Sequence, residues 1–174
     1  MIETNRLILR NWCDEDYSAF ARLNADPRVM RYFPACLSTT ESDALAERLR
    51  SLITQQDWGI WAVVLKQSNE FIGFTGLYGP TTDFTIEPSI EVAWRFATQY
   101  WGKGYATEAA SAVIAFGFEQ INLAEIIAFT AVVNQRSQAV MQRLGMQYQY
   151  DFAHPDLAVH HPLSQHCLYK IKAA

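Results

Sequence analysis

The sequence predicts an α+β fold in which helices flank a mixed sheet. Two apolar stretches of strand-like composition, residues 60–66 and 70–78, are separated by a short polar turn, which predicts an antiparallel hairpin. Further along, a strand, an Ala-rich helix and a second apolar strand follow one another at 90–96, 104–120 and 125–132. Two strands joined through a helix in this way run parallel. A hairpin and a parallel pair in one chain make the sheet mixed.

One strand and two helices are expected before the hairpin. Residues 6–10 alternate long polar and apolar side chains, which is typical of a strand with one buried face. A helix follows with Asp14 as its predicted N-cap, and the pair Asp26-Pro27 ends it. A second helix begins in 39–43 and turns four apolar side chains inward: Leu45, Leu49, Leu52 and Ile53.

After the hairpin, the chain returns to alternating strands and helices. Residues typical of a loop precede the strand 90–96, namely Asp83, Glu87 and Pro88. Asn134 is the predicted N-cap of the last helix, which turns Val140, Met141 and Leu144 inward, and Gly145 supplies its left-handed end. Two further strands are expected near 146–150 and 167–171. Seven strands are predicted in total.

Size and charge restrict the classes of function. The 174 residues fit a single domain spanning 1–174, and with half of the residues hydrophobic and 18% charged the composition is that of an ordinary globular protein. The net charge of −4 gives no general attraction for nucleic acid or for anionic membranes. We therefore expect neither nucleic acid nor membrane as a partner.

The cysteines and the amino terminus predict a cytoplasmic protein. Cys13, Cys36 and Cys167 are odd in number, widely spaced and free of any C-x-x-C pattern, so we interpret them as reduced thiols. The first residues contain no apolar signal core, and no apolar run is long enough to cross a bilayer.

A glycine-containing loop between the strand 90–96 and the helix 104–120 is a candidate anion site. Gly102 and Gly104 can take left-handed conformations that turn backbone N–H groups toward a ligand, and a helix start favours negative charge. The spacing does not match a dinucleotide loop, because the last position falls on Thr107. A nucleotide-triphosphate loop is excluded too, because Lys103 is followed by Gly104.

Three motifs lie in this loop, at the start of the chain and near its end. Gln99, Gly102 and Gly104 match Q-x-x-G-x-G, which resembles the acyl-coenzyme-A pyrophosphate loop of the GNAT N-acetyltransferases. The 101–109 segment is similar to the version of this loop in their RimJ/RimL-like branch. The start, residues 4–10, is similar to T-x-R-L-x-L-R. Asn134 to Ser137 and Leu144 to Met146 resemble the family's N-x-x-S and L-G-F segments.

The resemblance implies a fold and a reaction. The fold is the GNAT fold, with a mostly antiparallel sheet of six or seven strands, a central parallel strand pair and flanking helices. The reaction is the transfer of acetyl from acetyl-CoA to a primary amine, with a protein or peptide N-terminal α-amino group as the first acceptor. A small amine, such as an antibiotic or a polyamine, is the alternative acceptor.

The resemblance also implies which residues bind the coenzyme. The strand edge at Val92, Ala93 and Trp94 would pair with the pantetheine arm, and one of its amides would stabilise the oxyanion. Backbone N–H groups of the glycine loop would hold the pyrophosphate, from Gln99, Tyr100, Trp101, Gly102, Lys103, Gly104, Tyr105 and Ala106. Asn134 and Ser137 would lie beside the pantetheine, with a purely capping role as the alternative for Asn134.

Two residues are the catalytic candidates. Glu91 would accept the amine proton, directly or through a water, or else would only orient the substrate or pair with an arginine such as Arg95. Many family members place a proton-donating tyrosine seven residues after the motif's asparagine, and here that position is Met141, which cannot donate. The predicted acid is therefore Ser137, with a local capping hydroxyl as the alternative.

Other classes remain open from the sequence. The spacing of His154, His160, His161 and His166 matches no familiar metal site, so no metal is expected. The absence of a tyrosine at Met141 is compatible with a non-catalytic acyl-CoA-binding module. The acceptor-facing segments, roughly 29–40 and 151–164, contain no specificity motif, and a homodimer is expected only by family analogy.

Overall fold

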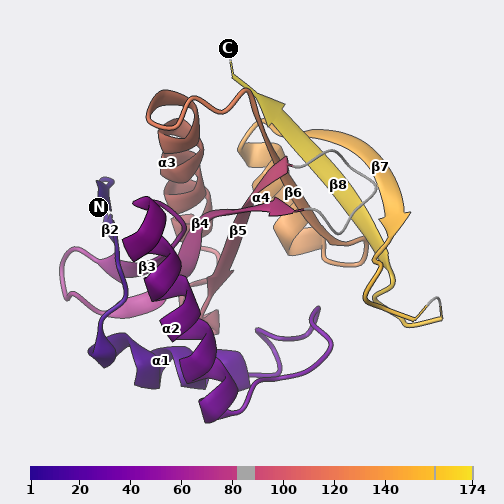
Figure 1. The fold of residues 1–174 in the computed structure, drawn as a ribbon. Coiled ribbons are helices and arrows are strands. Elements are labelled where there is room, and N and C mark those ends of the chain that lie inside the picture. Colours follow the sequence, from indigo (N-terminus) through magenta and orange to yellow (C-terminus); the bar gives the residue numbers. More distant parts are fainter. Residues whose placement is uncertain (82–88, 159, 174) are drawn as a thin grey trace.

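A computed structural model describes residues 1–81, 89–158 and 160–173 (Figure 1). The helices are α1 (Asp14–Ala25), α2 (Thr39–Gln56), α3 (Tyr105–Glu119) and α4 (Gln135–Arg143), with a 3₁₀ turn, η1, at Thr98–Tyr100. The strands are β1 (Ile2–Glu3), β2 (Leu7–Arg10), β3 (Ile60–Leu65), β4 (Phe71–Thr81), β5 (Ser89–Phe96), β6 (Glu125–Ala131), β7 (Gln147–Ala153) and β8 (Gln165–Lys172). The predicted loop residues Asp83, Glu87 and Pro88 lie outside the described residues.

The strands form one mixed sheet in the order β1-β2-β3-β4-β5-β6-β8-β7. Every pairing is antiparallel except that between β5 and β6, which confirms the predicted hairpin and the predicted central parallel pair. The described sheet has eight strands, so the expectation of six or seven is wrong. The extra strand is β1, whose two residues pair with β2 across a turn closed by Thr4 N–H to Leu7 C=O at 3.0 Å. Two residues are too few to show an alternating pattern.

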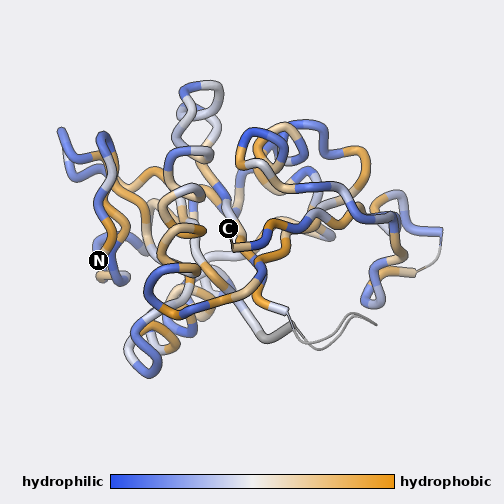
Figure 2. Tube along the Cα trace, turned by 90° about the horizontal axis from the view of Figure 1, so that it is seen from above, coloured by the Kyte–Doolittle hydropathy of each residue, from blue (hydrophilic) through white to orange (hydrophobic). Residues whose placement is uncertain are grey.

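The helices cover the two faces of the sheet separately. On one face, Gly117 of α3 lies so close to the sheet that a Cβ there would come within 2.8 Å of Ile126 and 3.2 Å of Leu77. On the other face, Phe20 of α1 packs its ring 5.8 Å from Phe74 of β4. Figure 2 shows hydrophobic segments gathered along the central strands and the helix sides that meet them.

The helix starts follow from local hydrogen bonding. Ser38 caps α2 because its hydroxyl accepts the Glu41 N–H, and the Glu41 carboxylate in turn accepts the Ser38 N–H at 2.7 Å. The predicted N-cap of α1 is wrong by one residue: Cys13 is the cap, and Asp16 accepts its N–H at 3.0 Å. Asp14 instead lies in the first turn, where its charge suits the helix dipole.

Two further sequence expectations can be compared with the structure. All three cysteines are free thiols, as predicted. Each helix in the described ranges is too short or too polar to cross a bilayer.

Candidate active site

The strands β5 and β6 diverge beside the glycine loop (Figure 1). Within the described residues they pair at one position, Glu91 opposite Ile127. The other edge of β5 pairs with β4 along its length, from Ser89 to Phe96. Beyond this position, no strand of the described residues pairs with the β6-facing edge of residues 93–96. An open strand edge of this kind can bind an extended ligand through its backbone.

The glycine loop directly follows this open edge. Gly102 and Gly104 have φ angles of 75° and 81°, which side-chain-bearing residues rarely adopt. A Cβ on Gly102 would meet no heavy atom within 4 Å, so the space beside the loop is open. Gly104 is the N-cap of α3, and no side chain caps this helix start. The positive end of the helix dipole therefore faces that space. The loop fits a phosphate-bearing ligand.

The amino-terminal motif holds this helix start in place. Thr4 Oγ1 donates to Glu108 Oε1 at 2.6 Å, and the Arg6 guanidinium donates to Glu108 Oε2 at 2.7 Å. Arg6 Nη1 also donates to the Lys103 carbonyl at 3.0 Å. Burial alone would raise the pKa of Glu108, but the hydrogen bonds from Thr4 and Arg6 outweigh that effect and lower it. Glu108 therefore positions the loop as a carboxylate.

Aromatic side chains fix the first half of the loop. Tyr100 is buried, and Trp101 Nε1 donates to the Phe96 carbonyl at 2.8 Å. The Arg136 guanidinium of α4 lies 4.6 Å from the Trp101 ring centroid. Side chains at these two predicted coenzyme positions thus anchor the loop. The backbone N–H groups of Tyr100 and Trp101 are also bonded within the chain, to the Ala97 and Thr98 carbonyls at 3.0 and 3.2 Å.

Glu91 lies on β5 at the point of divergence. Glu91 is partly buried, and desolvation raises the pKa of its carboxyl group to about 8. Among the described residues it forms no hydrogen bond or ion pair, so the alternative of a salt bridge to Arg95 is not observed. A carboxyl with this pKa exchanges protons near neutral pH, as a general base requires.

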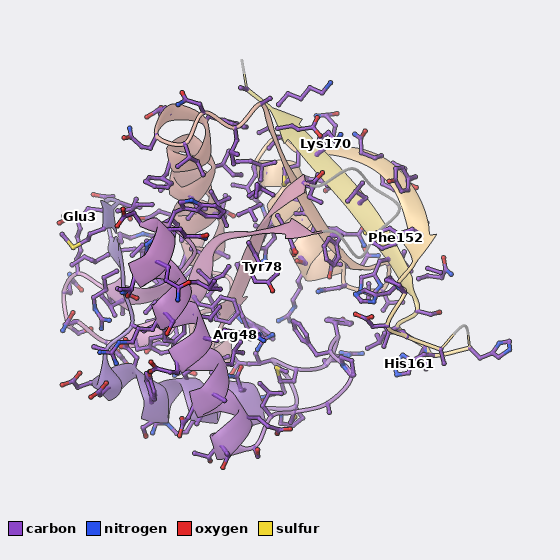
Figure 3. All side chains as sticks on the ribbon, viewed as in Figure 1. Glu3, Arg48, Tyr78, Phe152, His161 and Lys170 are labelled. Carbon is purple, nitrogen blue, oxygen red and sulfur yellow. The ribbon has the colours of Figure 1, made fainter. Side chains whose placement is uncertain are left out.

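Two neighbours share the face of the sheet that carries Glu91, and sequence reasoning missed one of them, Tyr78. Tyr78 is the residue opposite Glu91 on β4, is 43% exposed, and lies near the centre of the view in Figure 3. Arg95 follows Glu91 by four positions, so strand alternation places it on the same face. The alternation of the strand was enough to place Arg95 on this face. The position of Tyr78 depends on the register between β4 and β5, which the sequence does not show.

The amide of Asn134 is already occupied at the start of α4. Its oxygen accepts the Ser137 N–H at 3.3 Å, and its nitrogen donates to Thr130 Oγ1 at 2.9 Å. The capping alternative for Asn134 is therefore observed. The Ser137 hydroxyl is partly exposed and forms no hydrogen bond within the described chain, which leaves it available to a ligand.

Comparisons with known proteins agree on one family. The model of the acetyltransferase (GNAT) domain matches residues 6–147. The uncharacterized N-acetyltransferase YnaD of Bacillus subtilis is 31% identical over 84% of this chain and 82% of its own. The FsC-acetyl coenzyme A-N(2)-transacetylase of Aspergillus fumigatus is 29% identical over 87% of this chain and 66% of its own. A crystal structure of a GNAT-family acetyltransferase from Bacillus anthracis superimposes with a TM-score of 0.83 at 25% identity, covering 98% of this chain and 97% of that one.

The chain belongs to the GNAT acetyltransferase family. It is an enzyme of the transferase class, and GNAT acetyltransferases use acetyl-CoA and an amine acceptor.

At position 141 this GNAT enzyme has a core methionine, which cannot donate a proton. Met141 is 1% exposed and packs in the main hydrophobic cluster. A tyrosine in its place would need a partner for its hydroxyl or a path to the cleft.

The histidines form no metal site in the described part of the chain. There, no group of three His, Cys, Asp or Glu side chains is placed to hold an ion. The rings of His154 and His166 lie 4.8 Å apart, and burial, followed by the charge of His154, lowers the pKa of His166 to about 4. His166 is therefore neutral at physiological pH, and His161 lies at the molecule's edge (Figure 3).

Proposed function

We propose that this GNAT enzyme transfers acetyl directly from acetyl-CoA to a primary amine, and that Glu91 accepts the proton that the amine loses. The observation that carries the proposal is the position of Glu91. A carboxyl with a pKa of about 8 lies where β5 separates from β6, next to the open strand edge and the glycine loop. Glu91, the proposed base, therefore lies next to the strand edge along which the pantetheine arm and its thioester are predicted to bind.

The proposed chemistry balances with groups on this chain. Acetyl-CoA supplies the acetyl thioester. Glu91 takes a proton from the amine, directly or through a water, so that the nitrogen can attack the carbonyl carbon. A backbone N–H of Val92, Ala93 or Trp94 stabilises the negative charge that develops on oxygen. As the C–S bond breaks, the nitrogen loses its second proton, and the Ser137 hydroxyl relays this proton to the departing sulfur, so that Ser137 ends the step protonated.

For coenzyme binding, we propose the backbone of Gln99 to Ala106 as the pyrophosphate anchor. The positive φ angles of two glycines, the open space beside Gly102 and the start of α3 support this assignment. For Asn134, the observed capping bonds leave one amide hydrogen, so we assign it chiefly the positioning of Ser137.

For the acceptor, we propose a protein or peptide α-amino group, in keeping with the RimJ/RimL-like motifs of residues 4–10 and 101–109. A small-molecule amine is the second candidate, and the name of the Aspergillus relative, an N(2)-transacetylase, supports nitrogen as the accepting atom. A cytoplasmic homodimer remains our prediction for the protein's location and assembly.

A thiol-release screen tests the proposed function against a binding module that holds acyl-CoA without catalysis, since the buried Met141 cannot donate a proton. We expect acetyl-CoA to be cleaved in the presence of at least one class of amine or amino-terminal peptide, with a product 42 Da heavier by mass spectrometry, roughly the mass that acetylation adds. Tight acetyl-CoA binding without thiol release across the whole panel would favour the binding module instead.

A further inference from the structure

Arg95 is a partly buried cation with one hydrogen-bond partner in the described chain. A guanidinium has five N–H donors. Nη1 of Arg95 donates to Asn24 Oδ1 at 2.6 Å, whereas Nε is buried without a partner and Nη2 has none among the described residues. The group lies against two aromatic rings, 4.1 Å from the Phe33 centroid and 5.1 Å from that of Phe74.

Arg95 differs from the arginines that pair with carboxylates. Arg6, Arg10, Arg28 and Arg50 each lie 2.7–2.8 Å from an Asp or Glu oxygen, and all four are at least partly exposed. Arg95 has no carboxylate within ion-pair distance in the described part of the chain. Burial lowers its pKa to about 10, so it is still charged at neutral pH. Buried charges are normally paired, because desolvation of a lone ion is costly.

The acceptor substrate of the reaction can supply an anion to Arg95. Arg95 and Glu91 share one face of β5, which is the face that carries Tyr78 and the Phe33-containing connection between α1 and α2. We propose that Arg95 binds an anionic group of the acceptor, so that the substrate is an amine that also carries a carboxylate, as an amino acid or short peptide does. This inference rests on the proposed function of the same site.

The spacing of the two residues indicates the length of this acceptor. Cα atoms four positions apart on a strand are separated by about 13 Å. The Glu91 and Arg95 side chains span part of that distance, so the amine and the carboxylate should be separated by several bonds. A polyamine, whose two ends are both cationic, would place one of them beside Arg95 and be repelled.

Matched acceptor pairs test the inference. Glycylglycine, 6-aminohexanoate and L-lysine are each compared with their carboxamides, by thiol release and by calorimetric binding in the presence of coenzyme A. We expect the wild-type enzyme to prefer at least one carboxylate over its carboxamide by about tenfold or more in kcat/KM. The reason is that only the carboxylate accepts charge-assisted hydrogen bonds from the Arg95 guanidinium. Arg95→Met should reduce that ratio to about one, and Arg95→Lys, which keeps the charge but not the fork, should give an intermediate ratio.

Arg48→Met is the control, since Arg48 is an exposed arginine of α2 without an ion pair in the described structure, and it should retain the wild-type ratio. Equal use of carboxylates and carboxamides by the wild-type enzyme, or a preference that survives Arg95→Met, would overturn the inference. If no amine releases thiol, the proposed function fails. Calorimetry then still decides the inference, because a carboxylate preference in binding supports it and equal binding overturns it.

Discussion

Glu91 and Arg95 are an acidic and a basic group on one face of β5, yet they do not form an ion pair. At about 13 Å between Cα atoms, their attraction is weak compared with that of a contact pair. Desolvation therefore acts on each separately and raises the pKa of Glu91 while it lowers that of Arg95. Two poorly solvated groups on one surface are poised for a ligand that supplies both a proton and a negative charge.

Ser137 supports a prediction about the departing thiolate. In Ser137→Ala, we expect kcat at saturating acetyl-CoA to fall by about ten- to a hundredfold, because the sulfur loses its proton donor. The Ser137 N–H that caps onto Asn134 is a backbone group and survives the change, so the melting temperature should stay close to that of the wild-type enzyme. Full turnover in this variant would remove Ser137 from the acid role.

At the scale of elements, the amino-terminal motif and α3 form one unit through Glu108. We predict that Glu108→Gln lowers the free energy of unfolding at pH 7 by roughly 1–2 kcal/mol, because bonds to a charged acceptor are weakened. The same change should raise the KM for acetyl-CoA several-fold, since Arg6 also holds the Lys103 carbonyl of the loop. Urea unfolding and initial-rate kinetics measure the two effects.

The pH dependence of this effect has a definite sign. The folded-state pKa of Glu108 is depressed, so its stabilisation is complete above the unfolded pKa and is lost as the pH falls through the folded value. The stability difference between wild type and Glu108→Gln should therefore shrink below about pH 4. Asp14→Asn is the control, because Asp14 pairs with Arg50 at 2.8 Å while its side chain is 85% exposed, and such pairs contribute little. An equal stability loss in both variants would contradict the bracing role.

Hydrophobic periodicity predicted the elements well because each buries a regular face. The helix 104–120 and the strand 125–132 match α3 and β6 within a residue or so, since both pack along the centre of the sheet. The two-residue β1 escaped prediction because its pairing with β2 depends on a turn. The role of Thr4 and Arg6 as a brace was not visible either, because Glu108 lies more than a hundred residues away in the sequence.

At the scale of the whole molecule, the candidate active site forms where β5 and β6 separate within the sheet. The sequence motifs could place the coenzyme loop and the strand before it, but they could not show that β5 and β6 pair only at Glu91 and Ile127. The isolation of Arg95 was equally hidden, because it depends on Asn24, 71 positions earlier, and on rings from two other segments. Such features arise only when distant segments pack.

The most direct test of the proposed mechanism is the pH profile of kcat/KM for the wild-type enzyme and for Glu91→Gln, with an acceptor identified by the thiol-release screen. For wild type, we predict a rise with pH that levels off above about pH 8, because Glu91 must be ionised to accept a proton. Glu91→Gln should lose this rise and fall by about a hundredfold or more. Glu119→Gln, a change at an exposed carboxylate of α3, should behave as wild type. An unchanged rate and profile in Glu91→Gln would contradict the assignment of Glu91 as the base.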